Sequence, residues 1–227
     1  MVKLKETIQK AFPKHARVPL ITVALLHSIF YWIPPLLTGG AYHRDFSIFV
    51  DESIPFLPFF IIFYAGAYLQ WGFSYVYHSA ISRGVCTRLA AADIITKVVA
   101  AAFFVLIPTT MVRPALDSGV FDFLVGIIYF LDEPVNLFPS LHCAVSWLCF
   151  RSAFPIRRTL PRGYLLGQLV FTLLVFASTV FIKQHVFADI VGGVILAELA
   201  WLLSAHLPTE AVFGKLEAVF SRNKSNR

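Results

Sequence analysis

The sequence predicts an all-α protein: an integral membrane bundle of six transmembrane helices with an N-terminal interfacial helix. The 227-residue chain is 58% hydrophobic and only 14% charged, whereas a soluble domain carries about 25% charged residues. Its apolar stretches are continuous rather than alternating, which is typical of membrane helices and not of membrane β-strands. Several of them approach the roughly 20 residues that a helix needs to cross a bilayer.

The predicted elements follow in order from a basic N-terminal segment. Residues 4–12 have the amphipathic character of a helix that lies on the membrane surface. The apolar stretch after them is longer than a signal-peptide core and lacks a clear cleavage site, so we expect it to be retained as the first span. The fourth span is short, which suggests that protein shields part of it, and residues 120–131 before it predict a re-entrant or surface helix. The six predicted spans are 18–37, 54–77, 94–112, 140–154, 164–182 and 186–206.

The distribution of Lys and Arg predicts the orientation of the chain. When both termini are placed in the cytoplasm, sixteen of the 19 basic residues lie on the cytoplasmic side, in agreement with the positive-inside rule. Only Arg44, Arg113 and Lys183 lie on the extracytoplasmic or luminal side. The net charge of +6 belongs to these membrane-flanking segments, so we exclude nucleic acid as a partner and expect the lipid bilayer in its place.

The chain is predicted to form one domain over residues 1–227, with its functional motifs within about 94–206. Its three cysteines show neither a metal-binding spacing nor a disulfide framework. Three charged residues in or next to predicted spans have simpler interpretations. Asp93 and Lys97 have the i,i+4 spacing of a structural ion pair, and Glu198 is expected to pair with another helix or to line a polar cavity.

His185 and Asp189 are the first candidate catalytic residues. They stand four residues apart at the start of the last predicted span, a spacing that places both side chains on one helical face. A carboxylate beside an imidazole sets its tautomer and stabilises its charged form. A histidine held in this way is suited to act as a nucleophile or to carry a proton. The competing interpretation is an ordinary surface pair, but ionisable groups at membrane helix ends tend to be functional.

A second candidate segment, residues 139–142, opens the fourth predicted span with the sequence Pro-Ser-Leu-His. Proline is favoured in the first helical turn, and the free N–H groups of a helix N-terminus attract anions such as phosphate. Ser140 adds a hydroxyl group, and His142 is placed to protonate a leaving oxygen as a general acid. The alternative is that Ser140 only caps the helix and His142 packs in the interior.

Arg113 and Lys183 are the candidate cations on the same membrane face. Arg113 has the planar donor group that binds two phosphate oxygens at once, and Lys183 precedes His185 by two residues. Their simpler interpretations are an interfacial arginine and a lysine that extends to the lipid headgroups. A zinc site made of two histidines and an aspartate is a further reading of this region.

Together these residues resemble the type-2 phosphatidic acid phosphatase superfamily, which also contains the vanadium-dependent haloperoxidases. The motifs of that family are Lys-x6-Arg-Pro, Pro-Ser-Gly-His and Ser-Arg-x5-His-x3-Asp. In this chain the matching residues are Arg113 and Pro114 for the first motif, Pro139, Ser140 and His142 for the second, and Ser178, His185 and Asp189 for the third.

The resemblance implies a mechanism and a set of roles. His185 would attack phosphorus and form a phosphohistidine, Asp189 would orient its ring, and His142 would protonate the leaving oxygen and then activate water or an acceptor hydroxyl. No metal or cofactor is implied. The acidic character of the predicted outer loops favours a phosphate that is borne on a lipid and enters from the bilayer. The residues that would bind the phosphate are Arg113, Ser140, Lys183 and Ser178.

Three positions depart from the family pattern. Leu106 stands where the first motif has lysine, Thr179 where the third has arginine, and Leu141 where the second has glycine. Lys183 is a candidate replacement for one of the missing cations. Pro-Ser-Leu-His is similar to the inositol-phosphorylceramide synthase branch, which moves a phospho-headgroup between lipids. Three functions therefore stay open: a phosphatase acting on a phosphatidate-like lipid or an isoprenoid pyrophosphate, a lipid phosphotransferase, and a non-catalytic membrane protein.

Overall fold

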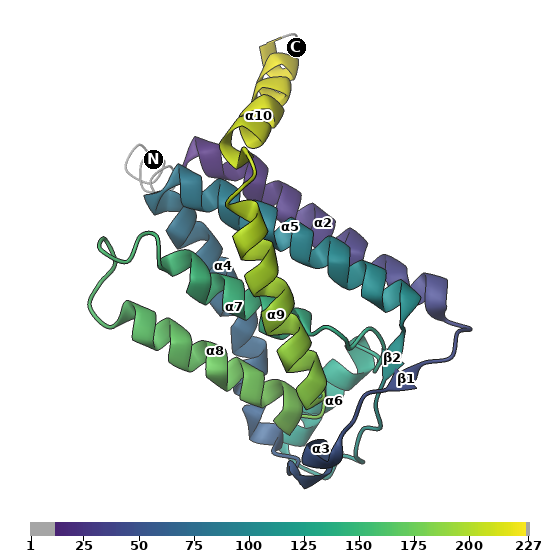
Figure 1. Ribbon diagram of the computed structural model, residues 1–227. Coiled ribbons are helices and arrows are strands. Elements are labelled where there is room, and N and C mark those ends of the chain that lie inside the picture. Colours follow the sequence, from purple (N-terminus) through teal and green to yellow (C-terminus); the bar gives the residue numbers. More distant parts are fainter. Residues whose placement is uncertain (1–11, 226–227) are drawn as a thin grey trace.

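The computed structural model describes residues 12–225, and nearly all of its secondary structure is helical (Figure 1). Within that range, five helices are long and apolar enough to cross a membrane, so the chain is an integral membrane protein. They are α2 (Lys14–Thr38), α4 (Ile61–Ile81, extended by the 3-10 turn η1, Pro58–Phe60), α5 (Arg83–Leu106), α8 (Tyr164–Phe181) and α9 (Phe187–Ser204). The other elements are β1 (Arg44–Asp45), α3 (Phe49–Ser53), β2 (Thr109–Thr110), α6 (Val120–Leu131), α7 (Leu141–Ala153) and α10 (Thr209–Ser225).

The fourth predicted span forms α7, which is too short to count among these five helices. Its 13 residues rise about 20 Å along the helix axis, less than the roughly 30 Å of a bilayer's hydrocarbon core. Eleven of them are buried, because α7 packs against α4, α8 and α9. The expectation that protein shields this segment is confirmed. The predicted count of six is not reproduced, since the described residues contain five apolar helices of spanning length.

Several predicted boundaries also shift. The helix of the third predicted span begins at Arg83 rather than Ile94, after Ser82 has capped it by accepting a hydrogen bond from the Val85 amide at 3.3 Å. The charged side chains before residue 94, which favoured a loop there, have partners inside the protein. Arg88, for example, donates to the Trp201 carbonyl at 2.9 Å. The predicted helix at 120–131 is confirmed as α6, α10 was not predicted, and the predicted interfacial helix at 4–12 lies almost wholly outside the described residues.

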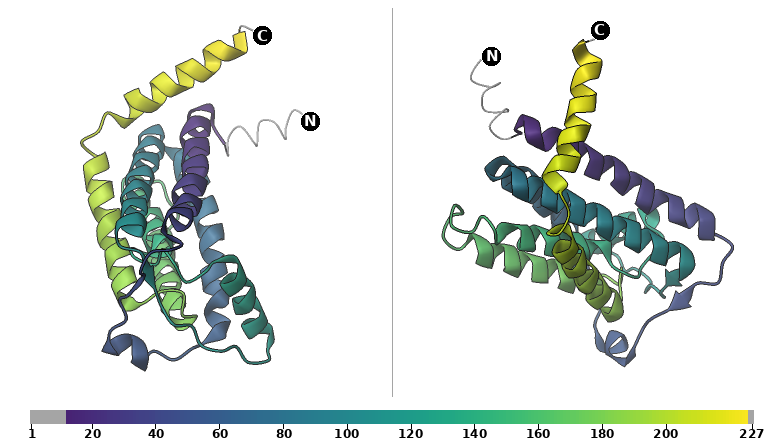
Figure 2. Two further views of the ribbon diagram at one scale, coloured as in Figure 1. Left: turned by 90° about the vertical axis from the view of Figure 1, so that its right-hand side faces the viewer. Right: turned by 45° about the horizontal axis from the view of Figure 1, so that its top comes forward.

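The helices form a bundle with two distinct ends (Figures 1 and 2). At one end lie β1, β2, α3, α6 and the turn between α8 and α9; at the other lie α10 and the loop between α7 and α8. The parallel strands β1 and β2 join the segment after α2 to the segment after α5, and Thr110 bridges onward to Val135. The largest core cluster includes Leu89, Leu148 and Trp201, which come from α5, α7 and α9. This packing holds the starts of α7 and α9 together at the first end.

Candidate active site

His185 and Asp189 occupy the turn between α8 and α9 and the first turn of α9. The His185 Nδ1 atom lies 3.1 Å from the Asp189 Oδ2 atom, and the same oxygen accepts a hydrogen bond from the Val186 amide at 3.0 Å. Both side chains are buried. Because the carboxylate engages Nδ1, the opposite nitrogen Nε2 is the one left to react. The predicted spacing therefore produces a paired histidine and aspartate.

The backbone of α7 meets the backbone of α9 at the position of Ser140. The Ser140 amide donates to the Asp189 carbonyl at 3.1 Å, and the Ser140 hydroxyl caps α7 by accepting from the Cys143 amide at 3.3 Å. Gly193 makes this approach possible, since a Cβ atom there would lie 2.5 Å from the Ser140 carbonyl oxygen. The contact brings the His142 and His185 rings to a centroid distance of 6.3 Å.

The His142 ring lies in an aromatic enclosure supplied by α4. It stacks on Tyr64 with ring centroids 4.1 Å apart, and Tyr68 and Trp71 contact its edges at 5.5 and 5.0 Å. Its Nε2 atom is buried and has no hydrogen-bond partner among the described residues. A buried polar atom without a partner is rare in folded proteins and marks a place where a ligand group can bind.

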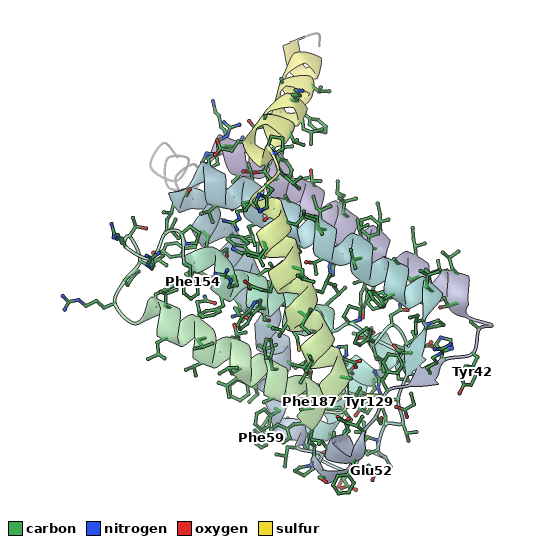
Figure 3. The ribbon with its side chains drawn as sticks, viewed as in Figure 1. Tyr42, Glu52, Phe59, Tyr129, Phe154 and Phe187 are labelled. Atoms are coloured by element: carbon green, nitrogen blue, oxygen red, sulfur yellow. The ribbon has the colours of Figure 1, made fainter. Side chains whose placement is uncertain are left out.

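Arg113 lies near the His185–Asp189 pair and is held from two directions. Its Nη2 atom donates to the Gln184 side-chain oxygen at 2.7 Å, next to His185 in the chain. Its guanidinium group lies 4.3 Å from the centre of the Tyr129 ring, and the Tyr129 hydroxyl donates to the Ile182 carbonyl at 2.8 Å. Figure 3 shows Tyr129 and Phe187 at the same end of the bundle, with Phe154 far from both.

The two histidines line one cavity of about 20 Å³. That space accommodates about one water molecule, so a phosphoryl group can enter only if lining side chains move. Burial raises the pKa of the Asp132 carboxyl group. The hydrogen bond from Tyr31 and the nearby charges of His185 and Arg113 lower this pKa, but their effect is smaller. Asn136 and Gln184 each present a buried polar atom with no partner among the described residues. The cavity is lined by Tyr31, Phe104, Asp132, Val135, Asn136, Leu137, Leu141, His142, Gln184 and His185.

Of the sequence-predicted site residues, only His142 and His185 line this cavity. Asp189 and Arg113 lie behind it, bonded to His185 and to Gln184, and Ser140, Ser178 and Lys183 do not line it either. The Lys183 ammonium group donates to the carbonyls of Asp51 and Ile54 at 3.0 and 2.7 Å, and burial lowers its pKa. The Ser178 hydroxyl donates to a carbonyl within α8 at 2.6 Å. The structure therefore groups His142, His185, Asp189 and Arg113, and it directs the side chain of Lys183 elsewhere.

The cavity also contains residues that the motif analysis missed. Gln184 adjoins His185, and Asn136 and Asp132 precede Ser140 by four and eight residues, so proximity to the motifs was their only signal. Tyr31 carried no signal, because it comes from α2, far away in the sequence. Its hydroxyl donates to the Asp132 Oδ1 atom at 2.5 Å.

The other charged groups inside the bundle form structural pairs. Glu198 accepts hydrogen bonds from the Arg151 guanidinium group at 2.8–3.1 Å and from the Trp147 indole at 2.9 Å, which confirms that it pairs with another helix. Lys97 and Asp93 form the expected i,i+4 pair at 2.5 Å. Within residues 12–225 no group of three His, Cys, Asp or Glu side chains is arranged to hold a metal ion.

A comparison with protein-family models matches residues 40–203 to a model described as the PAP2 superfamily. The matched range contains every candidate motif residue and omits α2. Comparisons with curated proteins and with solved structures gave no match.

Proposed function

This chain belongs to the PAP2 superfamily, and we propose that it is a lipid phosphatase that hydrolyses a lipid phosphate or pyrophosphate through a phosphohistidine. Membership of the family indicates a phosphatase-type membrane enzyme. The observation that carries the proposal is the pair of imidazoles in one cavity. His185 is bonded to Asp189 at 3.1 Å, and its ring centre lies 6.3 Å from that of His142.

The proposed reaction has two steps. In the first, Nε2 of His185 attacks phosphorus while the bond from phosphorus to the leaving oxygen breaks, and protonated His142 gives its proton to that oxygen. In the second, neutral His142 takes a proton from water, and the resulting hydroxide displaces His185 from phosphorus. Phosphoryl transfer depends mainly on positioning and charge stabilisation. In this proposal Arg113 and the backbone N–H groups at the start of α7 stabilise the phosphoryl oxygens.

An apolar groove supports a lipid as the substrate. The groove has a volume of about 380 Å³ and is lined mainly by apolar and aromatic side chains of α2, α4 and α7. Tyr68 and Trp71 line it and also contact the His142 ring, so a hydrocarbon chain in the groove would end near the catalytic cavity. We place the active site on the extracytoplasmic or luminal face, because Lys and Arg are concentrated toward the other end of the bundle.

The test uses purified full-length protein and a panel of lipid phosphates and pyrophosphates, with release of inorganic phosphate as the readout. We expect His185→Ala to lower the rate by at least about 1,000-fold, since it removes the nucleophile. His142→Ala should slow turnover by roughly 100-fold or more, because a positioned acid or base contributes about that much. The control is His206→Ala, which changes an exposed histidine at the opposite end.

Two other functions make different predictions in the same assay. A phosphotransferase, which the Pro-Ser-Leu-His sequence favours, would release no inorganic phosphate. It would consume the donor lipid only when an acceptor alcohol or lipid is added, and the phospho-group would appear on that acceptor. A non-catalytic protein would show equal background rates in wild type and His185→Ala. Acceptor-independent release that disappears in His185→Ala supports the phosphatase, and either of the other outcomes rejects it.

A further inference from the structure

The catalytic cavity has two chemically different sides. One side carries the His185 nucleophile with hydrogen-bond donors beside it: the His142 ring, protonated in the first step, and the Gln184 side-chain amide, with Arg113 behind it. The other side carries acceptors, namely the Asp132 carboxylate and the Asn136 side-chain oxygen. The donor side suits phosphoryl oxygens. The acceptor side does not, because a carboxylate repels a phosphate.

Asp132 is held in place and lacks a charged partner. Its Oδ1 atom accepts the Tyr31 hydroxyl at 2.5 Å. None of the salt bridges in the described part of the chain involves its carboxylate. Asp132 is half-buried, and within residues 12–225 Tyr31 is the one hydrogen-bond partner of its carboxylate. The Oδ2 atom is therefore accessible to a donor on a ligand.

Asn136 presents a second acceptor from a constrained loop. Its side chain is 7% exposed, and its Oδ1 atom has no partner within residues 12–225. The loop is fixed on both sides of Asn136. Thr110 bridges to Val135, and the Thr109 hydroxyl accepts the amides of residues 137 and 138 at 3.0 Å each. Because these contacts fix the loop, the Asn136 Oδ1 atom is held in place before a ligand binds.

The acceptor side is completed by a residue outside the family match. Tyr31 belongs to α2, whereas the PAP2 model covers residues 40–203. Tyr31 lines the cavity, and its ring stacks on His27 with centroids 5.7 Å apart, which orients the hydroxyl toward Asp132. The contact that positions this carboxylate thus comes from a helix that the matched family region does not include.

We propose that Asp132, Asn136 and Tyr31 form a subsite for hydroxyl groups of the substrate next to the transferred phosphoryl group. The hydroxyls belong either to the leaving headgroup or to an acceptor alcohol, and the inference rests on the proposed function. Asp132 and Asn136 accept the hydrogen bonds, and Tyr31 positions Asp132. A neutral hydroxyl fits better than an ammonium group, because Arg113 lies close enough to act electrostatically on Asp132 and would repel a second cation.

The leaving-group arm compares two phosphomonoester lipids in vesicles of full-length protein: phosphatidylglycerol phosphate, which has a hydroxyl beside the phosphate, and phosphatidate, which has none. We expect Asp132→Ala to lower kcat/KM for the first by roughly 10-fold or more, because a site built to bind a hydroxyl discriminates strongly. The value for phosphatidate should change by less than about threefold. Tyr31→Phe should show a smaller loss in the same direction.

The acceptor arm measures transfer of the phosphoryl group to glycerol or to propanol. A loss confined to glycerol transfer assigns the subsite to an acceptor, and a loss confined to phosphatidylglycerol phosphate assigns it to the leaving group. Glu133→Ala is the matched control, since this neighbouring acid is exposed and does not line the cavity. Asp132→Asn, which keeps the shape of the side chain, replaces Asp132→Ala if that variant fails to fold.

Three results overturn the subsite. They are equal losses on phosphatidate and phosphatidylglycerol phosphate, no loss on either lipid together with no loss of transfer to glycerol, and a loss that appears only with an amine-bearing headgroup. If wild type hydrolyses neither these two lipids nor any other member of the panel, the proposed function is rejected, whereas the subsite is not. The subsite is then tested by the unfolding temperature. Glycerol phosphate should raise that of wild type more than propyl phosphate does, whereas the two ligands should have equal effects on Asp132→Ala. Equal shifts overturn it.

Discussion

Arg113 shows how one residue connects the phosphate-binding chemistry to the fold. Its guanidinium group stacks over Tyr129 and donates to Gln184, and Tyr129 in turn bonds the turn that carries His185. Its Nε atom is buried without a partner among the described residues. The planar group is therefore oriented by one set of contacts while a donor is left for a ligand.

Replacing Arg113 with lysine tests whether this planar geometry matters. Lysine keeps the charge but loses the fork of donors and the stacked plane, so we expect kcat/KM to fall by roughly 10- to 100-fold, the range of one or two charge-assisted hydrogen bonds. The measurement is initial phosphate release from the best lipid substrate. Arg157→Lys, in the exposed loop at the other end, should match wild type. An Arg113→Lys enzyme within threefold of wild type contradicts this role.

The direction of the Lys183 side chain could not be predicted from the sequence. Its position two residues before His185 made it a reasonable phosphate ligand. The backbone at Lys183 takes a positive φ of 51°, and the side chain extends to the carbonyl of Asp51 in α3 and to that of Ile54 just after it. Spacing along the chain cannot reveal such a direction, because the turn at Lys183 decides which way the side chain points.

At the scale of elements, the site depends on how closely α7 and α9 approach. Their first turns share the bond from the Ser140 amide to the Asp189 carbonyl at 3.1 Å. Gly192 and Gly193 leave room for this contact, and added Cβ atoms would lie 2.4 Å from the Phe138 ring and 2.5 Å from the Ser140 carbonyl oxygen. The absence of side chains at these two glycines therefore permits the close approach of α7 and α9.

Gly193→Ala should therefore separate His142 from His185. We expect a loss of about 1–3 kcal/mol in stability, as for other overpacked sites. We also expect activity to drop by about 100-fold, the effect of a misplacement of about 1 Å. Gly167→Ala is the control, because a Cβ atom there meets nothing within 4 Å, and alanine in an exposed helix should stabilise by up to about 1 kcal/mol. Thermal unfolding and phosphate release measure both effects. Equal behaviour of the two variants would show that the close approach is not needed.

For the whole molecule, α7 decides how many times the chain crosses the membrane. It runs from the end with the catalytic cavity toward the end with α10 (Figure 1). Because eleven of its 13 residues are buried by protein, it needs neither the length nor the apolar character of a lipid-facing helix. We propose that it completes a sixth crossing inside a sheath formed by α4, α8 and α9.

Cysteine labelling tests this topology, because only α6 and α7 lie between residues 118 and 158. In sealed cells, a membrane-impermeant maleimide should label Ser118→Cys, whereas Arg158→Cys should react only after the membrane is permeabilised. The native Cys86, Cys143 and Cys149 are buried, so the parent protein is the unlabelled control. Labelling of both positions from one side would remove α7 as a crossing, and reversed labelling would place the active site in the cytoplasm.

The sequence by itself determined the membrane class, the helical fold and the pairing of His185 with Asp189. These follow from local rules, since hydropathy acts over about 20 residues and the i,i+4 spacing places side chains within one helical turn. The sequence also indicated that the fourth span is short and shielded by protein. Only the tertiary structure decided that Tyr31, Asp132 and Asn136 share a cavity with the histidines and that Lys183 points away from it. Those outcomes depend on which distant surfaces pack together, which the order of residues along the chain does not express.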